Sequence, residues 1–260
     1  MGWLRQAVVD LRPLRRREFR LLFGAQAVSL AGSQVTYVAI PYQAWRLTRS
    51  PLAVGLLGLA ELLPLLATAL PGGALADARD RRRTVQATEL GLAALAAALA
   101  GNALLARPHL WVLYAAAAGA AALQGLQRPS LDALPPRLVA REELPAAAAL
   151  EGLRGSLGMV AGPALAGLLV AAAGLPAAYT VDVASFGCSL LLLSRMRAVP
   201  PPEALPGPRA VREGLRYARG RPELLGTYLV DLVAMVFGMP LALFPAMADR
   251  YGGAGVLGVE

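Results

Sequence analysis

The sequence has no lysine, one cysteine, one histidine and few charged residues, and these shortages exclude several kinds of site. Cys188 alone cannot form an intramolecular disulfide, and no metal-ligand spacing occurs. There is no Ser-His-Asp, Cys-His or phosphate-loop arrangement, so the sequence predicts neither an enzyme nor a bound cofactor or metal. His109 stands beside Pro108 in a short connector, where a solvated side chain is the simpler interpretation.

Long apolar runs dominate the rest of the chain. Charged residues make up 16% of the 260 residues and hydrophobic ones 57%, whereas a typical soluble domain carries about 25% charge. A helix of about 20 residues crosses the hydrocarbon core of a bilayer. We therefore expect an all-α protein embedded in a lipid bilayer, with seven spans near 21–45, 52–76, 84–106, 110–134, 155–174, 177–194 and 224–247.

The arginines are distributed unevenly between these spans. A net charge of +8 in a soluble protein would suggest nucleic acid, but here the arginines lie at the ends of apolar runs, so we expect no such partner. If the N-terminus is cytoplasmic, inside segments hold 21 arginines and outside connectors hold four. Cytoplasmic loops are normally rich in arginine. We expect a multi-pass inner-membrane protein with these inside segments: 1–20, 77–83, 128–154 and 195–222.

One connector is much longer than the others. Residues 195–222 contain six prolines and seven arginines, which predicts a central loop between two membrane bodies. The first and seventh spans open with the same Leu-Leu pair, at Leu21 and Leu224, as if a second half repeated the plan of the first. We predict a six-helix half at 1–194, the loop, and the start of a second half at 223–260.

The turn between the second and third spans is the densest concentration of charge between two apolar runs. Asp77 and Arg81 are four residues apart and can pair on a helical turn, with Arg82 beside them. Gly72 and Gly73 would let the backbone approach a neighbouring helix closely. The simpler alternative is a charged turn that only fixes topology.

These residues carry a family resemblance. Residues 73–82 fit the loop pattern Gly-x-x-x-Asp-Arg-x-Gly-Arg-Arg of the major facilitator superfamily, except that Ala78 replaces Arg and Asp80 replaces Gly. Asp at that second position favours the enterobactin-exporter-like and drug-efflux-like branch. The resemblance implies a gate on the cytoplasmic side formed by Gly73, Asp77, Arg81 and Arg82, with Asp132 of the fourth span as a further member.

The fifth span carries a second match. Gly158, Gly162, Pro163 and Gly167 resemble the Gly-Pro motif found in helix five of antiporters of this superfamily. Glycines four residues apart also pack membrane helices without any further role, and proline permits a bend. Both interpretations stay open on the sequence alone.

The resemblance also implies where cargo would bind, because spans one, four and seven line the cavity in this superfamily. Amide and hydroxyl side chains on these spans are candidates for lining it, although hydrogen bonding between helices is an equal alternative. The candidates are Gln26, Ser33, Gln34, Tyr37, Gln127 and Tyr228.

Two carboxylates are candidates for proton coupling. A charged group inside a membrane is costly and usually faces protein or water, which singles out Glu61 and Asp231. The implied function is a proton-coupled exporter of a small amphipathic molecule, a siderophore or drug, working by alternating access. The alternatives are an importer or transporter of other cargo, or a non-transporting fragment. About five helices of the superfamily's plan would be missing, to be supplied by further C-terminal sequence or a partner chain.

Overall fold

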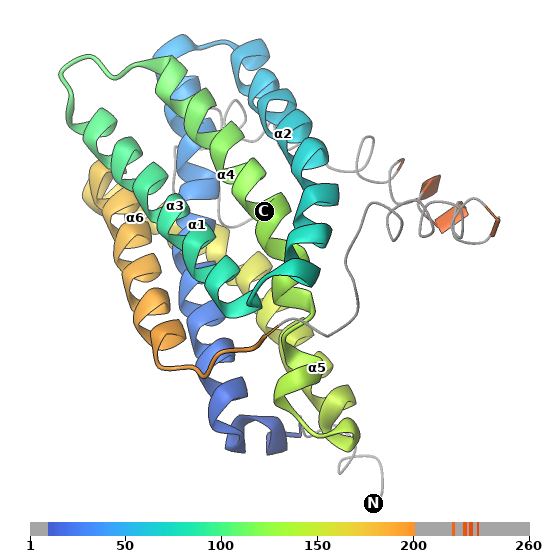
Figure 1. Cartoon of the computed structure of the whole chain (residues 1–260). Coiled ribbons are helices and arrows are strands. Elements are labelled where there is room, and N and C mark those ends of the chain that lie inside the picture. Colours follow the sequence, from blue (N-terminus) through green and yellow to red (C-terminus); the bar gives the residue numbers. More distant parts are fainter. Residues whose placement is uncertain (1–9, 201–219, 222–225, 228, 231–232, 234–260) are drawn as a thin grey trace, which may run out of the picture.

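The computed structural model describes residues 10–200, 220–221, 226–227, 229–230 and 233. All regular structure in these residues is helical, which confirms the predicted fold class (Figure 1). The predicted seventh span, most of the loop 195–222 and the region 223–260 lie outside the described residues. The elements are η2 (Arg12–Arg15), α1 (Arg17–Thr48), α2 (Pro51–Ala78), α3 (Arg81–Leu104), α4 (Leu110–Asp132), α5 (Pro135–Leu138), η3 (Arg141–Glu143) and α6 (Leu144–Ser194).

Short polar signals set the starts of α2 and α3. The Ser50 side chain accepts a hydrogen bond from Ala53 N before Pro51, the first residue of α2. Asp80 does the same for α3, since its Oδ1 accepts from Arg83 N at 3.3 Å. These caps satisfy backbone N–H groups that have no partner inside a helix. They also keep the connection between α2 and α3 very short.

Helix α6 contains both the fifth and the sixth predicted spans. At Gly174 the backbone leaves helical geometry, with φ 79° and ψ 174°, two residues before Pro176. Contacts with α1 show that the chain reverses there. Residues 154 and 158 contact Gln26 and Leu30 of α1, whereas Asp182 contacts Thr36. The two halves of α6 therefore run along α1 in opposite directions, and the bundle has six long helical segments in the described residues.

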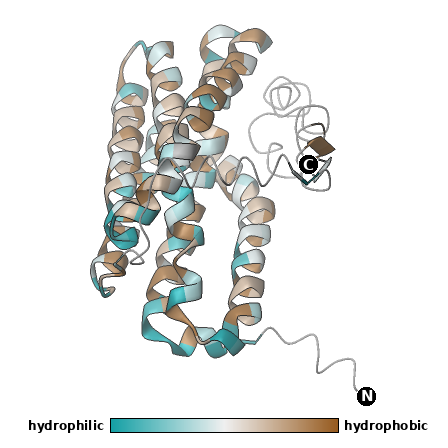
Figure 2. Ribbon diagram, turned by 45° about the vertical axis from the view of Figure 1, so that its right-hand side comes forward, coloured by the Kyte–Doolittle hydropathy of each residue, from teal (hydrophilic) through white to brown (hydrophobic). Residues whose placement is uncertain are grey.

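Four stretches are long and apolar enough to cross a membrane. They lie within Pro51–Ala69, Arg81–Leu104, Leu110–Leu138 and Arg141–Ser194, the last containing both halves of α6. Helix α1 is not among them, because it carries a series of glutamines, serines and threonines along its length. In Figure 2 hydrophobic residues run along the helices, and hydrophilic ones gather toward their ends.

Small side chains allow these helices to pack closely. Helix α1 packs mainly against α6, α2 against α4, and α3 against both α4 and α6. The largest core cluster surrounds the fully buried Tyr179 and Leu113 with alanines from α1, α4 and α6. Close approach of small residues is the usual way for membrane helices to associate. Many leucines of α2, such as Leu52 and Leu63, remain exposed on the outside of the bundle.

Candidate functional site

One end of the bundle collects most of the described arginines. The turn between α2 and α3, the start of α1, the short helix α5 and the chain leaving α6 all lie there (Figure 1). We call this the arginine end. It contains the predicted gate residues.

The structure places Arg81 next to Asp77. Arg81 Nη2 lies 3.7 Å from Asp77 Oδ1, the spacing expected for residues four apart. The Arg81 side chain is only 7% exposed, whereas that of Asp77 is 50% exposed. A half-exposed pair at this distance contributes little by itself. The Arg81 Nε is buried without a hydrogen-bond partner among the described residues, whereas the Arg81 backbone N–H bonds the chain that leaves α6.

Several groups of the arginine end contact the six residues after α6, which we call the strap (195–200). Met196 and Val199 of the strap are buried in a cluster with Leu22, Val85 and Leu134. Polar groups from α1, α3 and α5 bind its backbone. Arg17 Nη2 donates to Arg195 O at 3.0 Å, Arg82 Nη1 to Met196 O, Arg81 N to Val199 O at 3.4 Å and Arg137 Nη1 to Pro200 O at 2.7 Å, while Arg197 N donates to Glu18 Oε2 at 2.8 Å.

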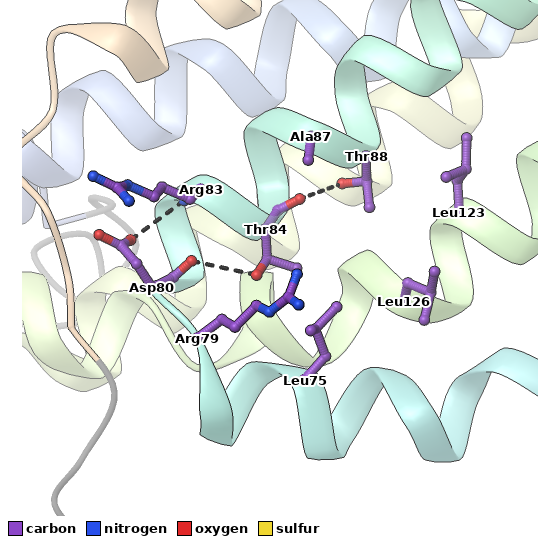
Figure 3. A pocket seen from close by; sticks show the side chains of 9 residues that line it. All are labelled: Leu75, Arg79, Asp80, Arg83, Thr84, Ala87, Thr88, Leu123 and Leu126. Carbon is purple, nitrogen blue, oxygen red and sulfur yellow. Dashed lines mark hydrogen bonds between the residues drawn. The ribbon is translucent and has the colours of Figure 1, made fainter.

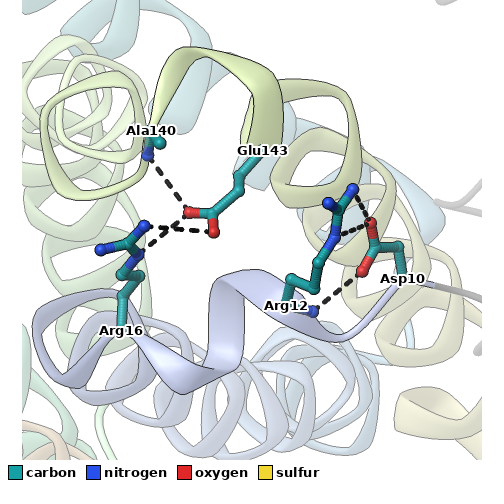
Figure 4. A network of polar contacts seen from close by, with 5 residues as sticks. All are labelled: Asp10, Arg12, Arg16, Ala140 and Glu143. Carbon is teal, nitrogen blue, oxygen red and sulfur yellow. Dashed lines mark hydrogen bonds and ion pairs between the residues drawn. The ribbon is translucent and has the colours of Figure 1, made fainter.

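A second polar contact ties α1 to the start of α6 (Figure 4). Arg16 Nε and Nη2 lie 3.2 and 3.4 Å from the two carboxylate oxygens of Glu143. The backbone N–H of Ala140 also donates to Glu143 Oε2, at 3.2 Å. The Arg16 guanidinium, and then the Ala140 N–H, hold the pKa of Glu143 below its usual range, because both favour the charged carboxylate.

Asp132 is placed differently from the other predicted gate residues. Its Oδ1 lies 3.4 Å from Arg128 Nε on its own helix, and both side chains are largely exposed. In the described residues Asp132 is therefore paired along α4 and not with Arg81. Its expected membership of the gate stays a proposal.

The two glycines before the turn behave differently. A Cβ added at Gly72 would lie 2.4 Å from the carbonyl oxygen of Gly125, so α2 and α4 touch there backbone to backbone. A Cβ added at Gly73 would meet nothing within 4 Å. The prediction of a close approach is thus correct for Gly72 and wrong for Gly73 within this bundle. Successive helical residues point about 100° apart, and only Gly72 faces α4.

The glycines of the Gly-Pro motif pack α6 against α1. A Cβ at Gly158 would lie 2.5 Å from Leu30 Cδ2, and one at Gly162 would lie 2.6 Å from Gln34 Cβ. Gln34 Nε2 also donates to Gly158 O at 3.1 Å. Gly167 is buried further along, and the helix continues through Pro163. Gln34, a predicted cavity residue, thus hydrogen-bonds between helices.

Gln26 joins three helices through a buried polar chain. Its Nε2 donates to Glu89 Oε1 of α3 at 3.4 Å, and its Oε1 accepts from Arg154 Nη1 of α6 at 3.4 Å. Arg154 also binds Glu151 at 2.5 Å. Glu89 is fully buried, and its Oε2 has no partner among the described residues. This chain was not foreseen from the sequence.

A second buried carboxyl lies further along α1. Asp182 is 2% exposed, and its Oδ2 accepts from Thr36 Oγ1 at 2.5 Å. Ser185 Oγ lies 3.4 Å from the other oxygen. Beyond it, Tyr179 OH donates to Gln43 Oε1 at 2.7 Å. The α1–α6 interface therefore has polar contacts at several positions along α1.

The remaining predicted residues fall into three groups. Tyr37 of α1 is 49% exposed, and Glu61 of α2 is partly buried. Ser33 is partly buried, and Gln127 is buried inside the bundle. Tyr228 and Asp231 lie outside the described residues.

Comparison with known proteins identifies the family. The profile of a family described as transmembrane secretion effectors, within the major facilitator superfamily, matches residues 8–259. The chain belongs to this family. The enterobactin exporters EntS of Shigella boydii serotype 18 and of Escherichia coli O1:K1 are each 30% identical to it over 240 residues. The match covers 90% of this chain and 56% of each exporter, so the chain spans about half the length of these relatives.

A solved structure supports the fold of this chain. The crystal structure of a POT family transporter in complex with a thioalcohol-conjugated peptide superposes with a TM-score of 0.60 at 14% identity. The superposition covers 90% of this chain and 52% of that transporter. The likeness shows that this chain shares the helical fold of part of that structure.

The sequence motifs do not single out three residues whose contacts the structure shows. Glu89 and Asp182 are not among the predicted site residues, although both are buried. The signal for both was present, because each is an acidic residue within an apolar run. Asp80 was read only as a family marker, although an aspartate before a helix start is a common N-cap.

Proposed function

We propose that this chain is a proton-coupled exporter of small amphipathic organic molecules, of the siderophore or drug class, working by alternating access. Its family and its relatives named enterobactin exporters support export. The observation that carries the proposal is the half-exposed side chain of Tyr37 on α1, together with the incompletely buried carboxyl of Glu61 on α2. A hydroxyl and a carboxyl left open on membrane helices are suited to a water-filled cavity and not to lipid.

Under this proposal the polar side chains have different roles. Tyr37 and Ser33 are cargo contacts, together with Gln127 and Tyr228, and Glu61 and Asp231 exchange protons. Gln26 and Gln34 are joined to other helices, so their contribution is to position α1 against α3 and α6. The Gly-Pro residues Gly158, Gly162, Pro163 and Gly167 give α6 its close contact with α1, as an antiporter would require.

We place the N-terminus and the arginine end in the cytoplasm. There Gly73, Asp77, Arg81, Arg82 and Asp132 form a gate toward helices beyond the described bundle. The open space beside Gly73 supports this, because a further helix could approach α2 on that side. The strap contacts of Arg81 and Arg82 hold the gate to the start of the central loop.

The test is efflux from cells that lack their own exporters. Cells producing the chain are loaded with a catecholate siderophore or a fluorescent amphipathic drug, and loss from the cells is followed with and without a protonophore. We expect protonophore-sensitive efflux, reduced at least tenfold by Glu61→Gln. The control is Glu142→Gln, which removes an exposed carboxylate from η3. Net uptake would establish an importer, and no flux of any compound would rule out transport by this chain alone.

A further inference from the structure

A cavity opens between α2, α3 and α4 at the arginine end (Figure 3). Its volume is about 600 Å³, within the range of small-molecule sites. In Figure 3 Arg79 and Arg83 lie with Asp80 toward one end, and Leu123 and Leu126 toward the other. The cavity is thus basic at one end and apolar at the other.

The side chains of Arg79 and Arg83 are not engaged by other groups in the described part of the chain. Both are exposed, and neither guanidinium has a hydrogen bond or ion pair with another described residue. This contrasts with Arg81 and Arg82 of the same turn, which are engaged by Asp77 and the strap. Two exposed guanidiniums that line one cavity without a protein partner are available to a phosphate group, which arginine binds through charge-assisted hydrogen bonds.

The other polar groups of the wall are already satisfied. Asp80 caps α3 through Arg83 N, and Thr84 Oγ1 donates to the Asp80 carbonyl at 3.3 Å. Thr88 Oγ1 donates to the Thr84 carbonyl at 3.0 Å. Apart from the arginines, what remains for a ligand is apolar surface from Leu75, Ala87, Leu123 and Leu126. The Asp80 carboxylate offsets one of the two charges, so the cavity favours a singly charged anion.

We propose that this cavity binds a phospholipid with an anionic headgroup. The headgroup phosphate lies between Arg79 and Arg83, and an acyl chain runs along the leucines of α2 and α4. The placement fits a lipid because the arginines lie at the ends of membrane-crossing helices, where headgroups lie, and the leucines extend toward the hydrocarbon. The proposal requires the membrane-embedded fold but neither a particular cargo nor proton coupling.

The test uses the whole chain, purified in a neutral detergent and titrated with fluorescent phosphatidylglycerol or phosphatidylcholine. We expect the wild-type protein to bind phosphatidylglycerol more tightly than phosphatidylcholine. An arginine near an anionic headgroup contributes about fivefold in affinity, so Arg79→Gln/Arg83→Gln should weaken phosphatidylglycerol binding by about thirtyfold. The matched control, Arg20→Gln/Arg141→Gln, removes two exposed arginines of the same end outside the cavity and should bind like the wild type.

A second variant tests the apolar end without changing charge. Ala87→Phe places a ring on the exposed position that lines the cavity and should lower phosphatidylglycerol binding while the arginines remain. If the test and control double variants lose phosphatidylglycerol binding equally, general surface charge explains the binding and the proposed site is wrong. Inorganic phosphate that displaces the lipid at equal concentration would assign the site to a free anion and overturn the lipid. Either result can be obtained whether or not the chain transports anything.

Discussion

Arg82 Nη1 donates a hydrogen bond to the backbone carbonyl of Met196, which joins the start of α3 to the chain leaving α6. The sequence interpretation assigned Arg82 to a gate between two halves of a transporter. In the described bundle it binds the strap of its own half. The strap is thereby held to the turn between α2 and α3, so a displacement of that turn would move the strap with it.

Loss of this contact should free the strap. In Arg82→Gln we expect trypsin to cleave after Arg197 about ten times faster than in the wild type, because hydrogen bonds from charged groups contribute about 1.5–3 kcal/mol. The measurement is the rate at which the intact chain disappears in detergent at low protease. Arg83→Gln is the control, since it removes an arginine of the same turn with no strap contact. Equal rates for the two variants would show that Arg82 does not hold the strap.

The two neighbouring glycines of α2 give a matched pair of variants. Gly72→Ala places a methyl group 2.4 Å from the Gly125 carbonyl oxygen, and the backbone cannot yield without separating α2 from α4. We expect a loss of about 1–3 kcal/mol in the free energy of unfolding, the usual cost of overpacking. Unfolding by a denaturing detergent in mixed micelles measures it.

Gly73→Ala is the control for this experiment. Its methyl group meets nothing within 4 Å, and alanine favours a helix over glycine by about 1 kcal/mol, so its stability should equal or exceed that of the wild type. Equal losses of stability in both variants would show that the loss does not come from the close contact between α2 and α4 at Gly72.

The Arg16–Glu143 contact gives a pH dependence whose sign is fixed by the lowered pKa of Glu143. Since the folded pKa lies below the unfolded value of about 4.3, the contact stabilises the protein above that pH. Its contribution is lost as the pH falls through the folded pKa. We therefore expect Glu143→Gln to be less stable than the wild type near pH 6, with the difference vanishing in acid.

Unfolding midpoints at several pH values provide the measurement for Glu143. Glu142→Gln is the neighbouring control, because Glu142 has no hydrogen bond or ion pair with another described residue. Its difference from the wild type should not follow this pH profile. A Glu143→Gln difference that persists undiminished below pH 3 would mean that the carboxylate charge is not the source of the stability.

Much of the fold could be predicted because membrane segments leave a strong signal in sequence. The first six predicted spans lie within α1, α2, α3, α4 and the two halves of α6, and the Gly174-Leu175-Pro176 connector is the reversal inside α6. Helix α6 begins at Leu144, before the predicted span 155–174, because residues 144–154 favour a helix without being apolar enough to count as a span. A hydrophobicity pattern locates the part of a helix that lies in the bilayer, and the helix itself can extend beyond that part.

The site could be predicted only where its contacts are local. Asp77 and Arg81 are four residues apart, and their pairing follows from helix geometry. The contacts of Glu89 with Gln26 and of Asp182 with Thr36 join residues 63 and 146 positions apart. Nothing in the spacing of one sequence shows which helices face each other. These partners, and the exclusion of Gly73 from the α2–α4 contact, required the fold.

The Thr36–Asp182 hydrogen bond can be measured by a double-mutant cycle with Thr36→Val and Asp182→Asn. Both groups lie in the α1–α6 interface, where Asp182 is 2% exposed, so water cannot replace the lost partner freely. Hydrogen bonds between membrane helices average about 0.6 kcal/mol and reach about 1.7 kcal/mol in such cycles. We expect a coupling energy toward the upper value, obtained from unfolding of the four proteins in mixed micelles.

Thr180→Val supplies the control cycle with Asp182→Asn. The Thr180 hydroxyl is exposed and donates to the Pro176 carbonyl of its own helix, so it shares no bond with Asp182 although it lies only two residues away. The two changes should therefore be additive within about 0.5 kcal/mol. Coupling of equal size in both cycles would point to a general loosening of α6. Coupling confined to Thr36 would show that the carboxyl of Asp182 fixes α1 against the second half of α6.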